Sequence, residues 1–315
     1  MKLMPFLLNF KTVSLLLLLQ GSKTQSSTVY NGLAATPPMG WISWTRFKCE
    51  INCDAKPFEC INEQLFIDTA NRLVEDGYME AGYTRLNLDD CWSAMQRSAK
   101  GELSADRRRF PHGIAWLAEY AHKRGLKLGI YANYGDKTCM GFPGSKGHLK
   151  QDAMTFASWG IDMLKMDGCF SNTNEFDSAY PEMATYLNAT GRDIVFSCSW
   201  PFYQLAVGRK PDYNAISKYC NLWRNYDDID SRWNSILRVI NYYEEHQSLV
   251  IGNPGLTVYQ ARTQMALWCL WSAPLFMSND LRNIRPEFKN ILLNRDLIAV
   301  DQDPLGIMGR RIHVE

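Results

Sequence analysis

The feature that most constrains the fold is a repeated order of amphipathic helix, glycine and apolar strand. Apolar residues at helical spacing predict helices over Glu63–Glu75, Ile114–Arg124, Gln151–Trp159 and Pro181–Leu187. A glycine stands between each helix and the strand that follows, where helices usually end. Such alternation predicts parallel strands, in either a doubly wound sheet or a barrel.

The faces of the expected strands favour the barrel. In Asp162–Asp167, Lys165 and Asp167 share one face with Met163, whereas Leu164 and Met166 share the other. Central strands of a doubly wound sheet are apolar on both faces. Here one face becomes polar towards the carboxyl end, as in a barrel whose active site lies at that end. No GxGxxG or GxxxxGK[ST] motif follows a strand, which argues against a nucleotide-binding fold.

The number of strands falls one short of a closed barrel, which has eight. The sequence predicts strands over Met39–Trp44, Thr84–Asp90, Leu126–Asn133, Asp162–Asp167, Ile194–Ser199, Asn221–Asp228 and Ala273–Ser278. Between the last two, only the short run Leu249–Ile251 has strand character.

The first residues have the layout of a secretory signal peptide. Lys2 and Lys11 are followed by the apolar run Thr12–Leu19 and by small polar residues. We expect a signal peptide over 1–27, cleaved somewhere in 21–29, and one barrel domain over 28–315. The alternative, a membrane anchor, needs about 18–20 apolar residues. We therefore expect no membrane span and a route to the lysosome or the extracellular space.

An exported chain can form disulfides, and eight of its nine cysteines lie between residues 49 and 220. They could form four bridges, whose pairing the sequence leaves open. A zinc site is the alternative, but CxxC spacing is absent and the five histidines are scattered, so we expect no metal. Cys269, in an apolar stretch, reads as a buried free thiol. Asn188 begins an Asn-Ala-Thr acceptor for N-glycosylation.

Carboxylates gather at three strand ends, at Asp89–Asp90, Asp167 and Asp227–Asp228, together with aromatic and cationic residues. A single aspartate at such a position is usually a helix cap or a turn residue. Carboxylate pairs beside aromatic rings suit the cleavage of glycosidic bonds. The net charge of +1 argues against nucleic-acid binding, and GxSxG and HExxH motifs are absent.

Several motifs, in one order from about residue 30 to the C-terminus, resemble those of glycoside hydrolase family 27, the melibiase type. They are PPMGWISW (37–44), LNLDDCW (86–92), GIYANYGDKTC (129–139), MLKMDGCF (163–170), FSCSWP (196–201), CNLWRNYDDI (220–229), APLFMSNDLR (273–282) and QDPLG (302–306). The resemblance implies a (β/α)8 barrel and a retaining glycosidase without a cofactor. Its substrates would be glycans with terminal α-linked galactose or N-acetylgalactosamine.

The resemblance also assigns roles to residues. Asp167 would be the nucleophile and Asp228 the acid/base, about 5–5.5 Å apart. Lys165 would help to keep Asp167 ionised, and Asp228 would need a raised pKa. The implied sugar contacts are Trp44, Asp89, Asp90, Tyr131, Lys165, Tyr203 and Arg224. The implied disulfides are Cys49–Cys91, Cys53–Cys60, Cys139–Cys169 and Cys198–Cys220. A homodimer is also implied.

By the same resemblance, Ser199 and Phe202 would determine which substituent the site accepts at C2 of the sugar, a hydroxyl or an acetamido group. A serine at the first position is typical of N-acetylgalactosaminidases, but Phe202 stands where these have alanine. We expect a preference for N-acetylgalactosamine, with galactose as the alternative.

Two departures from the family pattern affect the expected fold. The GPGxWNDPDML segment, which supplies the seventh strand, is absent between Gln247 and Leu249. The C-terminal β-domain of the family is expected to be absent as well. Either Leu249–Gly252 substitutes for the missing strand or the barrel keeps an exposed edge. The alternative to an active enzyme is an inactive, sugar-binding or misfolded splice or truncation isoform.

Overall fold

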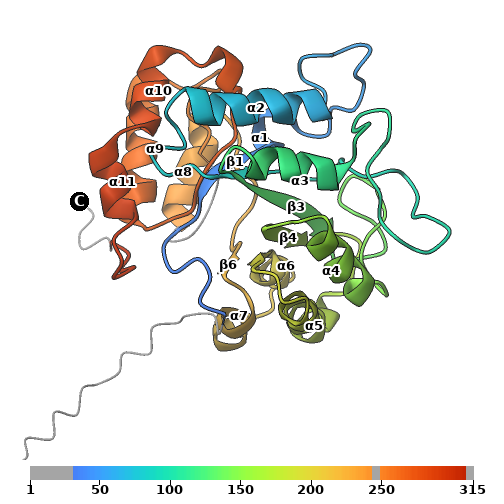
Figure 1. The fold of residues 1–315 in the computed structure, drawn as a ribbon. Helices are drawn as coiled ribbons and strands as arrows, with labels where there is room; N and C mark the ends of the chain where they lie inside the picture. Colours follow the sequence, from blue (N-terminus) through green and yellow to red (C-terminus); the bar gives the residue numbers. More distant parts are fainter. Residues whose placement is uncertain (1–30, 243–248, 310–315) are drawn as a thin grey trace, which may run out of the picture.

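The computed structural model describes residues 31–242 and 249–309, so the predicted signal peptide lies outside the described residues. Its centre is one sheet of seven parallel strands in the order β6-β5-β4-β3-β2-β1-β7. Strands β1, β3, β4 and β6 are labelled in Figure 1. The strands are β1 (Met39–Ile42), β2 (Arg85–Asn87), β3 (Lys127–Asn133), β4 (Met163–Asp167), β5 (Val195–Cys198), β6 (Leu222–Trp223) and β7 (Leu275–Met277). Each lies within one of the seven predicted strands, so the strand count and the parallel α/β fold are confirmed.

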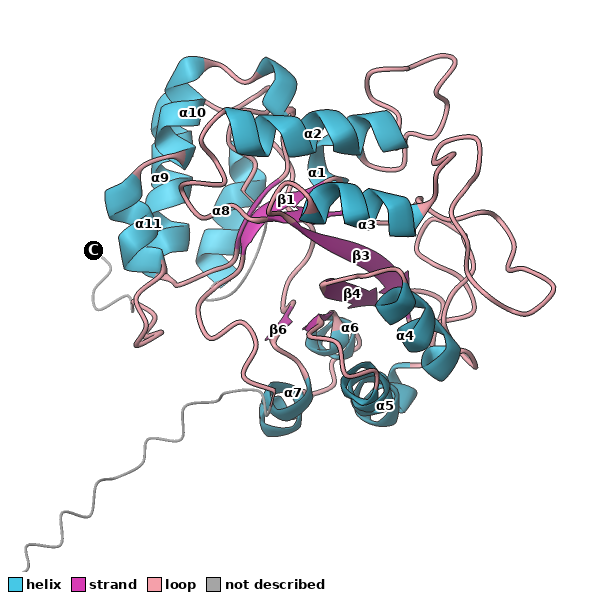
Figure 2. Cartoon of the chain, viewed as in Figure 1, coloured by secondary structure: helices cyan, strands magenta, loops and turns pink. Residues whose placement is uncertain are grey.

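Helices join and cover the strands (Figure 2). They are α1 (Trp44–Phe47), α2 (Glu63–Glu75), α3 (Ile114–His122), α4 (Leu149–Ser158), α5 (Phe176–Ala189), α6 (Trp200–Ala206), α7 (Tyr213–Tyr219), α8 (Trp233–Tyr242), α9 (Val258–Leu270), α10 (Pro286–Leu292) and α11 (Arg295–Asp301), with 3₁₀ turns η1 (Thr173–Glu175) and η2 (Leu281–Asn283). Figure 1 shows α9, α10 and α11 grouped at one side of the molecule. None of the helices in 31–242 and 249–309 is long and apolar enough to cross a membrane.

Helix α5 begins earlier than predicted. The sequence placed its start at Pro181, but it starts at Phe176 and includes the proline. Pro181 cannot donate a backbone hydrogen bond. The first turn remains helical because it buries two aromatic rings, Phe176 and Tyr180, whose centroids lie 5.2 Å apart.

The missing strand is replaced only in part. Leu249 forms an isolated parallel bridge with Met277 beside β7, and its amide donates to the Phe276 carbonyl at 2.7 Å. Leu249, Val250 and Ile251 are fully buried. At the other end of the sheet, β6 pairs only with β5 among the described strands. The barrel is therefore open between β6 and Leu249–Ile251, and we call this gap the open seam.

Two layers of apolar side chains stabilise the sheet. The larger one packs between the strands and the helices. The smaller one consists of Ile42, Met163, Val195, Leu222 and Phe276, one residue from each of five strands. Met163 shares its strand face with Lys165 and Asp167. This small cluster is therefore an apolar floor on the face that carries the polar residues.

The four disulfides in the structure are Cys49–Cys91, Cys53–Cys60, Cys139–Cys169 and Cys198–Cys220, the pairs that the family resemblance implies. Cys269 is free and buried. Disulfides persist in oxidising compartments, which places the chain in the secretory pathway. Asn188 lies exposed at the end of α5, accessible for glycosylation.

Candidate active site

Asp167 ends β4 and is 5% exposed. The Tyr131 hydroxyl donates to its Oδ2 at 3.1 Å, and the Gly168 amide donates to its Oδ1 at 3.2 Å. A Cβ at Gly168 would lie 2.7 Å from the ring of Tyr203. Glycine at this position therefore lets Tyr203 approach Asp167, and burial together with the Asp167 charge raises the pKa of Tyr203.

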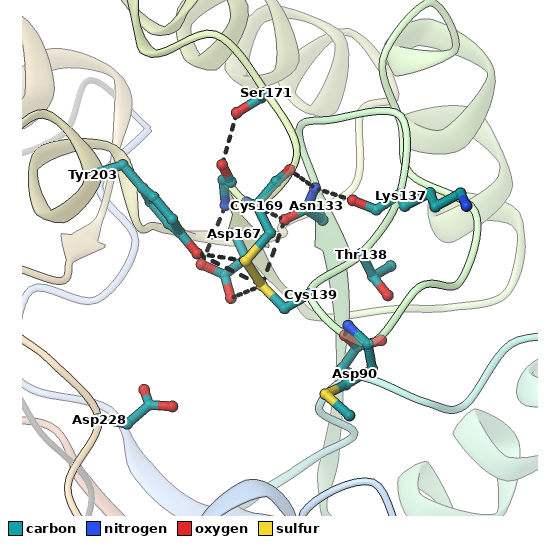
Figure 3. The surroundings of a disulfide bond; sticks show 12 residues. Asp90, Asn133, Lys137, Thr138, Cys139, Asp167, Cys169, Ser171, Tyr203 and Asp228 are labelled. Carbon is teal, nitrogen blue, oxygen red and sulfur yellow. Dashed lines mark hydrogen bonds between the residues drawn. A yellow bond between two sulfur atoms is a disulfide. The ribbon is translucent and has the colours of Figure 1, made fainter. Parts of the chain in front are cut away.

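The Cys139–Cys169 disulfide lies beside the carboxylate of Asp167 (Figure 3). Cys139 Sγ lies 3.4 Å from Asp167 Oδ2, and Cys169 Sγ lies 3.0 Å from the Tyr203 hydroxyl. The side chain of Asn133 accepts from the Cys169 amide at 2.7 Å. Asn133 was missed by sequence reasoning, although it lies on the same face of β3 as Tyr131 and ends that strand.

Asp228 approaches from a different part of the chain and lies apart from the cluster around Asp167 (Figure 3). The indole nitrogen of Trp44 donates to its Oδ2 at 2.7 Å, and Arg224 Nη2 lies 3.1 Å from its Oδ1. Burial raises the pKa of Asp228, but Arg224, Lys165 and the Trp44 hydrogen bond outweigh burial and leave it below its ordinary value. The expectation of a raised pKa is therefore wrong for this structure.

Arg224 contacts both carboxylates. Its Nη1 lies 3.9 Å from Asp167 Oδ1 and its Nη2 lies 3.1 Å from Asp228 Oδ1. Its Nε donates to the Tyr226 carbonyl at 2.7 Å. One cation thus lies against both groups that the family resemblance marks as catalytic.

Lys165 forms an ion pair with Asp89 and interacts with Asp167 through its charge. Its Nζ donates to Asp89 Oδ2 at 2.7 Å and lies 5.4 Å from the centre of the Tyr131 ring. Asp167 acts on Lys165 only through its charge. Lys165 and Asp89 therefore form an ion pair beside Asp167.

Asp90 is held in place by backbone donors. The amides of Cys91 and Met140 donate to it at 2.6 and 3.0 Å. Burial raises its pKa to about 6, although these amides act in the opposite direction. Burial therefore makes Asp90 easier to protonate than an exposed aspartate.

Ser199 and Phe202 lie at the start of α6. Ser199 is 2% exposed, whereas Phe202 is partly exposed and stacks on Arg224 with 3.8 Å between guanidinium carbon and ring centroid. The structure therefore gathers Asp167, Asp228, Arg224, Trp44, Tyr131, Tyr203 and Phe202 through direct contacts, with the pair Asp89–Lys165 adjacent. Ser199 lies beneath the surface beside them.

A cavity extends from Asp228 to the apolar floor. It is lined by Trp44, Lys165, Arg224, Asp228, Ile42 and Phe276, among others. Its lining combines the charged side chains of Lys165, Arg224 and Asp228 with apolar residues of the floor, a mixture that suits a small polar ligand beside Asp228.

An α/β barrel with carboxylates at the carboxyl ends of its strands is an arrangement typical of glycoside hydrolases. A model of the melibiase-type family described as alpha galactosidase A matches residues 36–251 and 245–303. The two matched segments overlap over residues 245–251, around the position where the family's seventh-strand segment is expected to be absent.

Comparisons with individual proteins and solved structures indicate the same family. The chain is 51% identical to human alpha-N-acetylgalactosaminidase over 95% of its length and 76% of that protein. It is 50% identical to human alpha-galactosidase A over 90% of its length and 70% of that protein. The structure of alpha-galactosidase I from Mortierella vinacea superposes with a TM-score of 0.80 at 30% identity, covering 91% of this chain and 78% of that one. The chain spans 64% of a Bacteroides fragilis structure described as an alpha-galactosidase/melibiase. The chain belongs to the melibiase family of α-galactosidases and α-N-acetylgalactosaminidases.

Proposed function

We propose that the protein removes terminal α-linked N-acetylgalactosamine or galactose from glycans by a retaining double displacement. The carboxylate of Asp167 attacks the anomeric carbon while Asp228 gives its proton to the leaving oxygen. Water then attacks the anomeric carbon while Asp228 takes one of its protons, and the bond between Asp167 and that carbon breaks as the new carbon–oxygen bond forms. This restores both carboxyl groups to their starting states.

The observation that carries this proposal is the contact of Arg224 with both Asp167 and Asp228. It brings to one site the two carboxyls that arise from β4 and from the loop after β6. Asp167 is buried with two hydrogen-bond donors, whereas the Asp228 side chain is 40% exposed. The fixed carboxylate of Asp167 suits a nucleophile. Because Arg224, Lys165 and Trp44 hold the pKa of Asp228 below its ordinary value in the free protein, the proton-donor role requires these contacts to weaken when the sugar binds.

The remaining residues would bind the sugar. Asp89, Asp90 and Lys165 would hold its outer hydroxyls, Trp44 would pack on the ring, and Tyr131, Tyr203 and Arg224 would contact it near Asp167. The ion pair of Lys165 with Asp89 supports this assignment, because it keeps a charged donor and acceptor together beside Asp167.

We propose N-acetylgalactosamine as the preferred sugar. Ser199 is small and buried, and Phe202 is held against Arg224, so its ring does not swing freely across Ser199. Galactose remains the competing substrate, and a pocket difference of this kind discriminates by only about 1–3 kcal/mol. We further propose action in the lysosome or outside the cell, as a homodimer.

The test uses purified chain with p-nitrophenyl α-N-acetylgalactosaminide and α-galactoside at about pH 4–5. We expect faster release from the first substrate, and we expect Asp167→Asn to lower kcat by about 10³-fold or more. Asp228→Asn should also lower the rate. The matched control is Asp296→Asn, which removes a carboxylate at an exposed position in the first turn of α11, and it should retain most activity. Faster galactoside release would overturn the sugar preference.

A second candidate is a protein that binds these sugars without hydrolysing them. The open seam favours it, because the barrel wall beside Asp228 is incomplete. A folded, monodisperse sample that binds N-acetylgalactosamine but releases no nitrophenol would support this function and contradict hydrolysis.

A further inference from the structure

Phe202 and Arg224 are held together by the backbone as well as by their side chains. The Phe202 amide in α6 donates to the Arg224 carbonyl at 3.0 Å, and the Arg224 amide donates to the Cys198 carbonyl at 2.9 Å. The guanidinium carbon lies 3.8 Å from the ring centroid. A guanidinium over an aromatic face gains both dispersion and cation–π attraction.

Stacking on the Phe202 ring restricts the conformations available to the Arg224 guanidinium. Its Nε is engaged by the Tyr226 carbonyl, and its two terminal nitrogens face Asp167 and Asp228. An arginine side chain has several rotatable bonds, and ordering it costs conformational entropy. A ring covering one face of the planar group removes part of that freedom before any substrate binds.

We propose that Phe202 is a positioning residue, whose ring fixes the plane of the Arg224 guanidinium between Asp167 and Asp228. This inference rests on the proposed roles of the two carboxyls. Phe202 itself touches neither of them in the contacts described above. Its effect on catalysis would pass through Arg224.

The consequence is a specific change in proton affinity. Burial raises the pKa of Asp228, and Arg224 is the strongest influence that lowers it. The other charged groups that face Asp228 are Lys165 on β4, Lys48 after α1 and, through Arg224, Asp227 and Asp167. A substitution at position 202 leaves these groups in place, so a loosened Arg224 should raise the pKa of Asp228.

Two substitutions at position 202 distinguish an effect of the flat aromatic face from an effect of apolar side-chain volume. Phe202→Leu keeps an apolar side chain but removes the flat face, whereas Phe202→Tyr keeps the face. Tyr259→Leu removes a 78% exposed ring on α9 and serves as the control. Near-ultraviolet circular dichroism would check the fold of each variant.

The primary readout is carbon NMR titration of protein labelled at the aspartate carboxyl carbon. The Asp228 signal is assigned by its loss in Asp228→Asn. We expect Phe202→Leu to raise its midpoint by about half a pH unit or more, with Phe202→Tyr and Tyr259→Leu matching the wild type. An unchanged midpoint in folded Phe202→Leu would overturn the proposal, as would equal shifts in the leucine and tyrosine variants.

Turnover supplies the second readout. The alkaline limb of kcat/KM, which reports the proton donor, should move to higher pH in Phe202→Leu and stay in place in Phe202→Tyr. Because the titration needs no turnover, it decides the role of Phe202 even if the wild type hydrolyses nothing. Failure of the proposed function and failure of this inference are therefore separate results.

Discussion

The indole nitrogen of Trp44 donates a 2.7 Å hydrogen bond to the carboxylate of Asp228. Trp44 follows β1 and Asp228 follows β6, strands that lie far apart in the order of the sheet. The bond therefore connects two sides of the site across the carboxyl ends of the strands. The bond also stabilises the ionised form of Asp228, so removing it should change the pKa of that carboxyl.

Trp44→Phe should raise the pKa of Asp228, because it removes a hydrogen bond that favours the charged carboxylate. Asp228 is 40% exposed, so solvent screening should limit the change to less than about 1 pH unit. The measurement is the alkaline limb of kcat/KM, which should move upward. Trp92→Phe, in a buried indole that donates to the Tyr131 carbonyl, is the comparison. An equal shift there would contradict a specific effect of Trp44.

Asp301 should make the fold more stable in acid. It is fully buried at the end of α11, and Gln302 donates to its Oδ2 at 2.6 Å, whereas its Oδ1 has no hydrogen-bond partner among residues 31–242 and 249–309. Burial raises its pKa to about 7. Cys269 and Tyr83, which face it, provide no positive charge. The folded protein therefore favours the protonated carboxyl.

The sign of the pH effect follows from that raised pKa. The stabilisation is fully present below the unfolded pKa of about 4 and is lost as pH rises through about 7. Asp301→Asn should remove up to about 3 kcal/mol of the change in unfolding free energy between pH 5 and pH 8, since about two pH units of that range lie below the folded pKa. Urea denaturation at pH 5 and pH 8 measures it. Asp303→Asn, at an exposed position nearby, should behave as wild type. Equal pH dependence in Asp301→Asn and wild type would exclude this role.

Gly168→Ala should disturb the packing around Asp167. The added Cβ would lie 2.6 Å from the Phe176 ring and 2.7 Å from the Tyr203 ring. We expect a loss of about 1–3 kcal/mol in the free energy of unfolding and a fall in kcat. Phe176→Leu in the same chain removes the nearest ring atom, so the double variant should lose less than the sum of the single variants. Strict additivity in urea denaturation would show that this clash is not the cause.

Leu249→Ala tests whether the partial replacement strand stabilises the barrel. Leu249 is fully buried and pairs with β7, so its truncation should cost about 2–5 kcal/mol in the free energy of unfolding. Leu305→Ala is the matched control, since Leu305 is 75% exposed. Similar denaturation midpoints for both variants would show that Leu249 does not contribute as a core strand.

The parallel fold was predictable because each strand carries its own local signal. Alternation in Met163–Asp167 separates polar from apolar faces, and a glycine precedes each of four strands. The start of α5 was not predictable, because its first turn depends on contacts of Phe176 and Tyr180 with the core. Local sequence shows only Pro181, which normally begins a helix or interrupts it.

The sequence could predict which residues form the site, but it could not predict their pKa values. The strand-end pattern singles out Asp89, Asp167 and Asp228, and the family motif supplies the roles of Asp167 and Asp228. The lowered pKa of Asp228 depends on distances to Arg224 and Trp44 that no local pattern encodes. The same is true of Phe202, whose stack on Arg224 joins residues from two different elements.

The most direct test of the central claim is to trap a sugar on Asp167. A fluorinated N-acetylgalactosaminyl or galactosyl fluoride that slows the second step should leave one sugar residue bound to the protein, detectable by intact mass. Peptide mapping should place it on Asp167, and Asp167→Asn should remain unlabelled. A label on another residue, or a folded wild-type chain with neither label nor turnover, would contradict the retaining mechanism proposed here.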